Sequence, residues 1–259
     1  MLRPRLIPCL LIQDGGLVKT IKFKDPKYVG DPINAVRIFN EKEADELVVL
    51  DIDATVQGFE PNYERIGLLA AECRMPLCYG GGVKSAKQAK RISSLGVEKI
   101  AVSAAALTNP ELISEIAAEI GSQSVVVVLD VKKKLLSKQY EVWTHNAKHN
   151  TKRNPVDVIE QMQALGAGEI VINFIEHEGT MKGMPLDAIK LFKSICSIPF
   201  TVMGGAGSLD DLGDVVYENG LLGVAAGSLF VFKGSYRAVL INYPSQLQKH
   251  EKIYGRCHV

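Results

Sequence analysis

The 259-residue chain has no excess of either charge and no long apolar segment. Its 30 Lys and Arg residues stand against 29 Asp and Glu residues, which leaves a formal net charge of +1. Nucleic acids and anionic membranes attract proteins with a basic excess, so this balance argues against both as general partners. No apolar run approaches the roughly 20 residues needed to cross a bilayer. We therefore expect no membrane span and no nucleic-acid partner.

The cysteines form no recognisable framework. There are five of them, an odd number, and none makes a CxxC pair or a metal-ligand spacing. This usage fits reduced thiols in the cytoplasm better than disulfides. The apolar start of the chain is interrupted by Pro8 and reaches Gln13-Asp14 without a small-residue cleavage site, unlike a signal peptide. We expect a soluble, cytoplasmic protein.

Motifs for common cofactors and nucleophiles are also missing. No nucleophile elbow, Walker loop or dinucleotide-binding glycine motif follows an apolar run. His145 and His149 have the i, i+4 spacing of a helical metal site, but they lie in a polar stretch without a third ligand. The sequence therefore predicts neither a metal nor a cofactor.

The chain does contain a regular alternation of short apolar runs and amphipathic helical patterns. The runs are rich in Val, Ile and Leu, as is typical of strands buried on both faces of a parallel sheet. Eight such units in about 250 residues indicate an α/β fold of the (βα)8 TIM barrel type, predicted as a single domain over residues 1–259. An open doubly wound sheet ranks second. The expected strands are Leu6–Ile12, Leu47–Leu50, Pro76–Tyr79, Ile100–Ala105, Val125–Leu129, Ile170–Ile175, Pro199–Met203 and Leu221–Ala226.

Two helices have clear start signals. Asn109 as N-cap with Pro110 at the first helical position begins one, and Asn154 with Pro155 begins another. Each is followed by an apolar stripe at helical spacing and closed by a glycine. These helices are expected to cover the outside of the sheet.

Two segments look irregular, namely residues 13–31 and residues 131–153. The second contains an expected hairpin with residues 139–144 as one arm. Both follow strand ends, where barrel enzymes place mobile substrate loops.

The two halves of the chain echo each other. Residues 79–82 (YGGG) reappear as residues 203–206 (MGGA), 124 positions later, and the segment around Ser103 reappears around Ser228, 125 positions later. Residues 50–53 match residues 172–175 in the same way. Several matches at about half the chain length indicate two (βα)4 halves related by a pseudo-twofold axis.

Each half combines a glycine turn with a hydroxyl after its strands. Glycine lets backbone N–H groups approach a phosphate, and barrels often bind phosphate after strands seven and eight. One such turn alone is more simply explained as a tight connection. Two at the repeat offset indicate two anionic sites on opposite sides of one mouth, suited to an elongated bisphosphate or nucleotide-sugar substrate. The candidates are Gly81, Gly82, Ser103, Gly204, Gly205, Gly227, Ser228 and Lys19, the last of which fits a solvated face equally well.

Asp130 is the leading candidate for acid–base catalysis. It ends the apolar run Val125–Leu129, and a carboxyl in a partly dehydrated cavity has a raised pKa. The simpler alternative is an aspartate that anchors a loop or caps a helix. Glu176 and Glu178 add two carboxyls after the sixth strand, and we expect His177 between them to be an exposed loop histidine.

Four charged residues stand directly before buried strands, which places them at the bottom of the predicted barrel. Such charges usually serve solubility and stability, and the pattern alone favours that interpretation. They are Arg5, Glu46, Lys99 and Glu169.

The sequence closely resembles the cyclase subunit of imidazole glycerol phosphate synthase, the HisF family, over essentially its whole length. Members are (βα)8 barrels that dock a glutaminase subunit on the bottom face. Ammonia passes through the barrel to the top, where a two-phosphate ribonucleotide is cyclised and cleaved. The matching stretches include residues 5–10, 14–15, 18–19, 30–32, 45–48, 50–52, 80–82, 121–123, 166–169, 179–180 and 204–207.

The resemblance implies roles for individual residues. Asp130 matches one of the two catalytic aspartates of the family, and Glu98 stands where an aspartate usually meets the glutaminase. The four bottom charges match the family's ammonia gate: Arg5, Glu46, Lys99 and Glu169.

The top of the predicted barrel departs from the family. Leu11 occupies the place of the other catalytic aspartate. Losing one member of a cooperating acid–base pair lowers the catalytic rate by about 10²–10⁴-fold or more. Ser103-Ala104 replaces an Asn-Thr pair, which removes one hydroxyl from a phosphate site. Glu176 and Glu178 replace two shorter aspartates.

This asymmetry is similar to divergent members in bacterial surface-polysaccharide clusters. There a barrel and a glutaminase-like partner supply ammonia to a sugar amidotransferase, which converts an acetamido group to an acetamidino group. The resemblance thus implies a subunit of a glutamine amidotransferase-coupled enzyme that supports sugar amidination. Two alternatives remain: a histidine-pathway lyase in which another carboxylate such as Glu178 replaces the missing aspartate, and a non-catalytic scaffold for the glutaminase.

Overall fold

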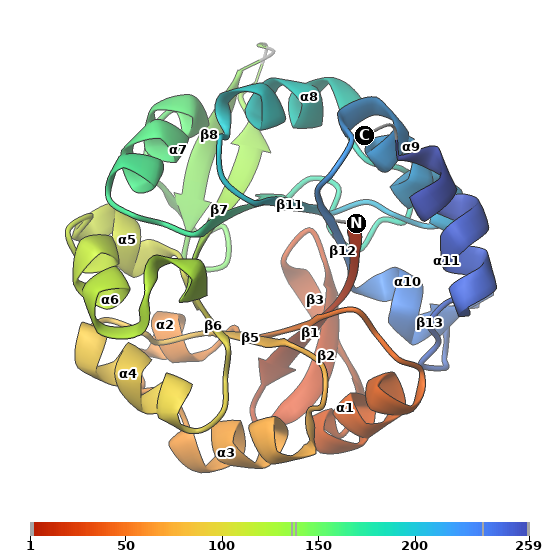
Figure 1. Cartoon of the computed structure of the whole chain (residues 1–259), viewed down its shortest axis with the longest axis horizontal. Coiled ribbons are helices and arrows are strands. Elements are labelled where there is room, and N and C mark those ends of the chain that lie inside the picture. Colours follow the sequence, from red (N-terminus) through yellow and green to blue (C-terminus); the bar gives the residue numbers. More distant parts are fainter. Residues whose placement is uncertain (1–2, 136, 138, 235, 258–259) are drawn as a thin grey trace.

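The computed structural model describes residues 3–135, 137, 139–234 and 236–257, and these form a closed barrel of eight parallel strands (Figure 1). Each barrel strand pairs with the next, and the last pairs with the first. The predicted TIM barrel is therefore confirmed. Its strands are β1 (Arg5–Gln13), β4 (Leu47–Asp51), β5 (Leu77–Gly80), β6 (Lys99–Val102), β7 (Val125–Lys133), β10 (Glu169–Phe174), β11 (Phe200–Met203) and β12 (Gly223–Ala226).

The longer helices form a ring outside the strands (Figure 1). They bury their apolar stripes against the outer face of the barrel, as Ala89 and Ile92 of α4 do. No helix in the described ranges is long and apolar enough to cross a membrane. The ring consists of α1 (Pro32–Glu41), α3 (Tyr63–Glu72), α4 (Ala86–Ser94), α6 (Leu112–Ile120), α7 (Pro155–Ala164), α8 (Leu186–Ile195), α9 (Leu209–Asn219) and α11 (Gln246–Lys252).

Successive side chains of a strand point alternately outward and inward, so two apolar cores result. The outward residues pack under the helices in the larger cluster. The inward residues fill the barrel with small or thin side chains, among them Cys9, Cys78, Ala101 and Ala225. Burial on both faces explains why these strands are continuous apolar runs in the sequence.

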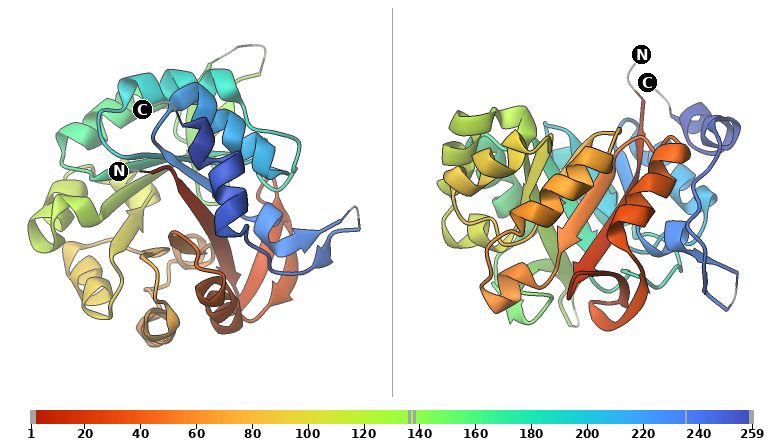
Figure 2. Two further views of the ribbon diagram at one scale, coloured as in Figure 1. Left: turned by 45° about the vertical axis from the view of Figure 1, so that its right-hand side comes forward. Right: turned by 90° about the horizontal axis from the view of Figure 1, so that it is seen from below.

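Two hairpins extend the barrel beyond its strands at the carboxyl ends (Figure 2). The predicted hairpin is present, since β7 continues into an antiparallel pairing with β8 (Tyr140–Thr144), which pairs with β9 (His149–Asn150). The segment 13–31, expected to be irregular, instead forms β2 (Gly16–Ile21) and β3 (Lys24–Gly30). Strand β3 is mostly exposed and contains Pro26, so it lacks the apolar alternation that marks a strand in the sequence.

Two predicted boundaries are wrong because short helices follow barrel strands. Strand β6 ends at Val102, and residues 104–105, predicted as strand, belong to α5 (Ala104–Thr108). Asn109 ends this helix, where its backbone N–H donates to the Ala105 carbonyl at 2.8 Å. It is therefore not the N-cap of α6, which begins at Leu112 after Glu111. The predicted cap at Asn154 is confirmed, because its side chain accepts from the Val156 N–H at 3.1 Å.

The pseudo-twofold relation holds with one change of alignment. Ser103 precedes α5 just as Gly227 precedes α10 (Ser228–Val231), so these two residues are equivalent at an offset of 124. Ser228 is then equivalent to Ala104 rather than to Ser103. The two hydroxyls thus occupy different positions in the two halves.

Candidate active site

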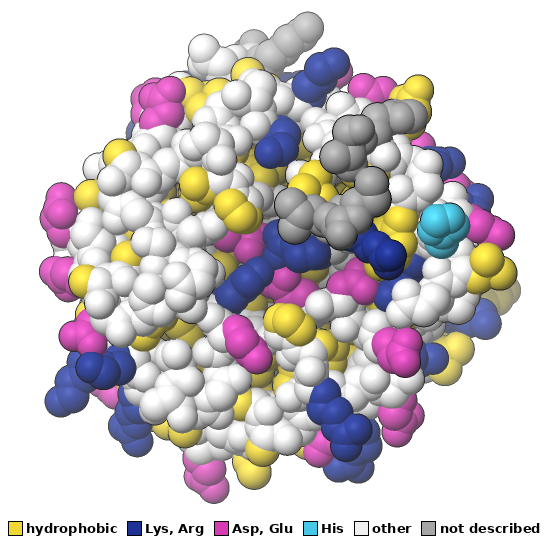
Figure 3. Space-filling model, viewed as in Figure 1, with side chains coloured by type: hydrophobic (Ala, Val, Ile, Leu, Met, Phe, Trp, Pro, Cys, Tyr) yellow, Lys and Arg dark blue, Asp and Glu magenta, His cyan; other side chains and the backbone are white. Residues whose placement is uncertain are grey.

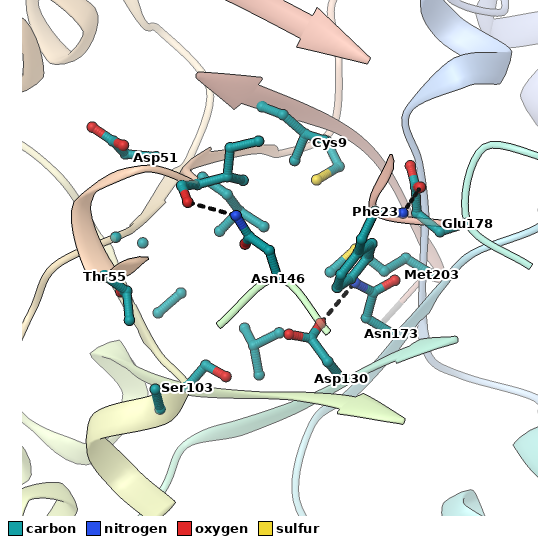
Figure 4. A pocket seen from close by; sticks show the side chains of 18 of the residues that line it. Cys9, Phe23, Asp51, Thr55, Ser103, Asp130, Asn146, Asn173, Glu178 and Met203 are labelled. Carbon is teal, nitrogen blue, oxygen red and sulfur yellow. Dashed lines mark hydrogen bonds between the residues drawn. The ribbon is translucent and has the colours of Figure 1, made fainter. Parts of the chain in front are cut away.

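A cavity of about 500 Å³ opens at the carboxyl ends of the barrel strands. It collects the top-face residues that the sequence singled out for catalysis or phosphate binding except Glu176, which is exposed and accepts from the Lys133 backbone N–H at 3.2 Å. The residues brought together are Leu11, Lys19, Gly81, Gly82, Ser103, Asp130, Glu178, Gly204, Gly205, Gly227 and Ser228. Figure 4 shows Asp130, Ser103 and Glu178 on different sides of this cavity.

Asp130 lies in β7 beside Asn173 of β10, its partner in the strand register. The Asn173 side-chain amide donates to the Asp130 carboxylate at 2.8 Å (Figure 4). Burial raises the pKa of Asp130 to about 7, although the Asn173 hydrogen bond opposes the shift and the nearby Glu178 adds to it. The carboxyl is therefore poised to exchange a proton near neutral pH.

Leu11 presents an apolar side chain to the same cavity from β1. It faces Leu50 of β4 in the strand register, and both pack on the inner core of the barrel. The β1 position at which the resemblance places a second acid is thus occupied by hydrocarbon.

Glu178 is held by the β2–β3 hairpin. Its carboxylate accepts from the Thr20 hydroxyl at 3.0 Å and from the Phe23 backbone N–H at 3.2 Å (Figure 4). Burial raises the pKa of Glu178, while these hydrogen bonds and the charge of Lys19 act in the opposite direction. The carboxyl therefore lies at the hairpin side of the cavity and carries its own set of partners.

Lys19 of β2 is buried beneath the same hairpin. Its ammonium group donates to the backbone carbonyl of Cys9. Burial lowers the pKa of Lys19, and the charge of Glu178 counters this. This residue brings a cation into the cavity wall, as a phosphate site requires.

The glycine turn after β5 runs close to the neighbouring strand. Gly81 has φ +130°, and a Cβ atom there would lie 2.5 Å from the Asp51 carbonyl oxygen. Only glycine fits this approach. The Gly82 N–H donates to the Thr55 hydroxyl at 3.3 Å, so this turn is already tied to the next loop.

The turn between β8 and β9 reaches over the cavity. The Asn146 side chain donates to the Ile52 carbonyl at 2.9 Å and so bridges two loops of the mouth (Figure 4). Next to it, His145 and His149 meet edge to face with ring centroids 6.3 Å apart. His177 is half-buried rather than exposed as expected, because its Nδ1 bonds the Gly183 carbonyl at 3.2 Å.

The four bottom charges form one closed ring of ion pairs. Arg5 bonds Glu46 at 2.5 Å and Glu169 at 2.7 Å, and Lys99 bonds each of the same glutamates at 2.8 Å. Figure 3 shows basic and acidic side chains gathered at the centre of this face. Burial alone would raise the pKa of Glu169, but Arg5 and Lys99 lower it to about 2. Glu169 is thus held as a carboxylate.

Two residues that the sequence analysis missed complete this ring. The buried Thr201 hydroxyl donates to Glu169 at 2.6 Å and accepts from Arg5 at 3.1 Å. Gly223 leaves the space that Arg5 and Thr201 fill, because a Cβ atom there would collide with the threonine hydroxyl. Glu98 lies on the same end of the barrel, exposed, and accepts from the Leu77 N–H at 2.8 Å.

An apolar section of the barrel separates the ring from the cavity. It is lined by inward side chains such as Val126, Val171, Cys78 and Cys9. Burial raises the pKa of Cys9 to about 11 and raises that of Cys78 well above its usual value, so both thiols stay neutral. The axis of the barrel therefore runs from a charged ring through an uncharged section to the cavity that contains Asp130 and Lys19.

Comparison with known proteins agrees with this architecture. Residues 5–237 match the family described as histidine biosynthesis protein. The chain is 59% identical over 249 residues to a protein of Leptospira borgpetersenii, covering 96% of this chain and 98% of that one. It is 56% identical over 256 residues to a protein of Vibrio vulnificus, covering 98% and 97%. Both relatives are provisionally named as HisF-type subunits of imidazole glycerol phosphate synthase.

A relative named HisF without that qualification is more distant. The imidazole glycerol phosphate synthase subunit HisF of Chlorobium phaeovibrioides is 38% identical over 233 residues, covering 90% of this chain and 92% of that one. Similarity is thus higher to the provisionally named group than to this subunit. The chain belongs to the histidine biosynthesis protein family and is a divergent HisF-like paralogue within it.

Proposed function

We propose that this chain receives ammonia from a glutaminase partner through its barrel and supports amidination of a surface-polysaccharide sugar precursor. The observation that carries the proposal is the contrast between the two ends of the barrel. The ion-pair ring of Arg5, Glu46, Lys99 and Glu169 is complete at the bottom. At the top, Leu11 lines the cavity with Asp130 where the resemblance places a second catalytic acid.

The route for ammonia runs along the barrel axis. The glutaminase would dock on the bottom face, with Glu98 at the interface, and the ring would act as the gate. Lys99 bridges both glutamates and keeps the gate closed, so its displacement would open the axis. Neutral ammonia crosses the apolar section more readily than ammonium, because burying a charge there is costly. The neutral thiols of Cys9 and Cys78 add no charge to this section.

The cavity would hold a phosphorylated small molecule. The two glycine turns, Gly81-Gly82 with Ser103 and Gly204-Gly205 with Gly227-Ser228, both line the cavity, which supports two phosphate sites. Lys19 supplies a cation on the second side. Asp130, with its pKa near 7, would take the proton that the incoming nitrogen releases. We expect the complex in the cytoplasm, where the five free cysteines stay reduced.

Complementation of a histidine auxotroph that lacks the cyclase tests the proposal against the histidine-pathway alternative. We expect no growth, because a single acid–base carboxyl at Asp130 does not replace a cooperating pair. A Leu11→Asp variant tests whether the missing acid is the reason for the absence of growth, and Leu11→Asn is its uncharged control. Growth supported by the unmodified chain would overturn the proposal and assign histidine synthesis.

Affinity purification of the tagged chain from its native cells tests the partners. We expect a glutaminase and a sugar amidotransferase, and a glutaminase activity that rises when the chain is present. Asp130→Asn separates a catalytic barrel from a scaffold. Loss of product with the complex still assembled supports catalysis, whereas full activity would show that the barrel only holds its partners together.

A further inference from the structure

The cavity has a cation at its edge that comes from outside the barrel repeat. After β12 and α10, the chain forms a small hairpin of β13 (Phe232–Lys233) and β14 (Ala238–Val239). Arg237 lies in this hairpin, directly before β14. Its Nη2 donates to the Gly179 carbonyl at 2.9 Å and to the Ser228 hydroxyl at 3.3 Å. Both acceptors line the cavity, so the guanidinium lies directly behind this part of the cavity wall.

The orientation of Arg237 is fixed by stacking. Its guanidinium carbon lies 4.8 Å from the centroid of the Phe232 ring, and Phe232 is buried. Lys27 of β3 places its ammonium 5.3 Å from the same centroid. The hairpin thus packs beside the β2–β3 hairpin, and two cations share one aromatic ring.

The guanidinium has donors to spare. Its Nε and Nη1 groups meet no acceptor within the described part of the chain, and no carboxylate there pairs with Arg237. A planar fork of free N–H groups beside a hydroxyl and a glycine turn matches the oxygens of a phosphate.

The pseudo-twofold relation shows why a cation is needed from elsewhere. In the first half, Lys84 follows the glycine turn within the same loop and lines the cavity. Ser85 caps α4 and Ser208 caps α9, so these two serines are equivalent, and Gly207 stands at the position of Lys84 in the second half. On this side the positive charge comes from Lys19 of the β2–β3 hairpin and from Arg237 of the C-terminal hairpin.

We propose that Arg237 binds the terminal phosphate monoester of the substrate at the Gly227-Ser228 turn and selects for a phosphate over an uncharged group. The inference rests on the proposed function only in taking this turn as a phosphate site. Arg237 is a binding residue, and it sets which end of an elongated substrate lies on the second half of the barrel.

Calorimetric and ³¹P NMR titrations of the full chain with ribose 5-phosphate and with inorganic phosphate test the proposal. We expect Arg237→Met to weaken one site by about tenfold or more, since it removes charge-assisted hydrogen bonds. Arg237→Lys keeps the positive charge but loses the planar guanidinium. Its affinity for phosphate should therefore lie between those of the unmodified chain and Arg237→Met. Lys27→Met is the matched control, because Lys27 stacks on the same ring but, within the described residues, bonds neither Gly179 nor Ser228. The phosphate affinity of this variant should stay within about twofold of that of the unmodified chain.

The outcomes separate this inference from the proposed function. If both Arg237 variants bind phosphate as the unmodified chain does, Arg237 only braces the hairpin and the inference is overturned, while the proposed function stands. A lower melting temperature with unchanged phosphate affinity overturns the inference in the same way. If the unmodified chain binds neither phosphate probe, the phosphate site itself fails and the inference fails with it. Should Arg237→Met not fold, Arg237→Lys retains the cation over Phe232 and carries the comparison.

Discussion

At the scale of single residues, Asp130 is held in surroundings that disfavour its charged form. Burial raises its pKa from 3.8 to about 7, so the folded chain keeps a proton that the unfolded chain has already lost between these pH values. The contribution of this group to stability is therefore zero below about pH 4 and becomes increasingly unfavourable up to about pH 7. The buried Asp130 carboxyl therefore titrates near neutral pH, and its burial lowers the free energy of unfolding at that pH.

Asp130→Asn should therefore stabilise the protein at high pH. The amide oxygen can still accept from Asn173, but no charge has to be buried. We expect a gain of at most about 4 kcal/mol in the free energy of unfolding at pH 8 and almost none at pH 4. Urea unfolding at both pH values measures this difference. Glu160→Gln, which makes the same exchange at an exposed position of α7, should show no such pH trend.

Asn173 shows how such a residue is tuned by its neighbour. Its amide nitrogen is used by Asp130, whereas its buried Oδ1 has no hydrogen-bond partner among the described residues. Its hydrogen bond favours the carboxylate of Asp130. Asn173→Ala should consequently raise the pKa of Asp130 further, and ¹³C NMR of the Asp130 carboxyl would register this as a titration shifted to higher pH. A titration at unchanged or lower pH would contradict the role given to Asn173.

At the scale of elements, the β8–β9 turn depends on one side-chain bond across the mouth. His145, Asn146 and Ala147 all have positive φ values of 54–60°, a conformation that asparagine tolerates better than alanine does. Asn146→Ala should therefore lose both the hydrogen bond to Ile52 and part of the preference for positive φ. Asn146→Gly should lose only the hydrogen bond. A lost bond of about 1 kcal/mol predicts roughly fivefold faster hydrogen exchange in the turn.

Hydrogen exchange read by mass spectrometry over residues 144–149 would measure this effect. Asn150→Ala is the matched control, because Asn150 bonds Glu141 at 2.8 Å within the hairpin and leaves the bridge to Ile52 intact. Equal exchange rates in Asn146→Ala and the unmodified chain would mean that the turn stays over the cavity without the bridge.

The helices and strands that could be predicted from the sequence are those whose own residues carry the pattern of their burial. Barrel strands such as Val125–Leu129 are visible because burial on both faces leaves only apolar residues. The exposed strand β3 carries no such pattern, and Asn109 has the residue type of an N-cap while it ends α5. Short-range sequence cannot tell which of two adjacent helices an asparagine serves.

The site was predictable only as far as its residues follow strand ends. Asp130 and the glycine turns were found in this way, since the carboxyl ends of parallel strands meet at one mouth. Thr201 joins Arg5 across 196 positions, and Arg237 joins Gly179 across 58. These contacts form only when the barrel closes and the C-terminal hairpin folds back, so no local sequence pattern predicts them.

At the scale of the whole molecule, the ion-pair ring ties four parts of the barrel together at one end. Arg5, Glu46, Lys99 and Glu169 come from or directly precede β1, β4, β6 and β10. The low pKa of Glu169 means that the ring contributes stability above about pH 4.5, which is lost as the pH falls towards 2. The same four residues thus brace the barrel, and in the proposed function they are also the gate of its axis.

Lys99→Ala separates these two roles. It leaves Glu46 and Glu169 with Arg5 as the one remaining cation of the ring, so we expect a loss of roughly 3 kcal/mol in the free energy of unfolding. If the ring is also the gate, a ring without Lys99 cannot close behind the ammonia, which then escapes to solvent. The fraction of ¹⁵N from the glutamine amide that reaches product should fall, and free ammonium should rise, while the reaction supplied with external ammonium stays active. Arg5→Ala should act in the same direction, because it also leaves both glutamates with a single cation.

Lys90→Ala is the control, because it removes an exposed ion pair with Glu119 on the outer surface. It should change neither the free energy of unfolding nor the transfer of ¹⁵N. Intact nitrogen transfer in a destabilised Lys99→Ala protein would leave the ring as a brace alone and would reject the gate.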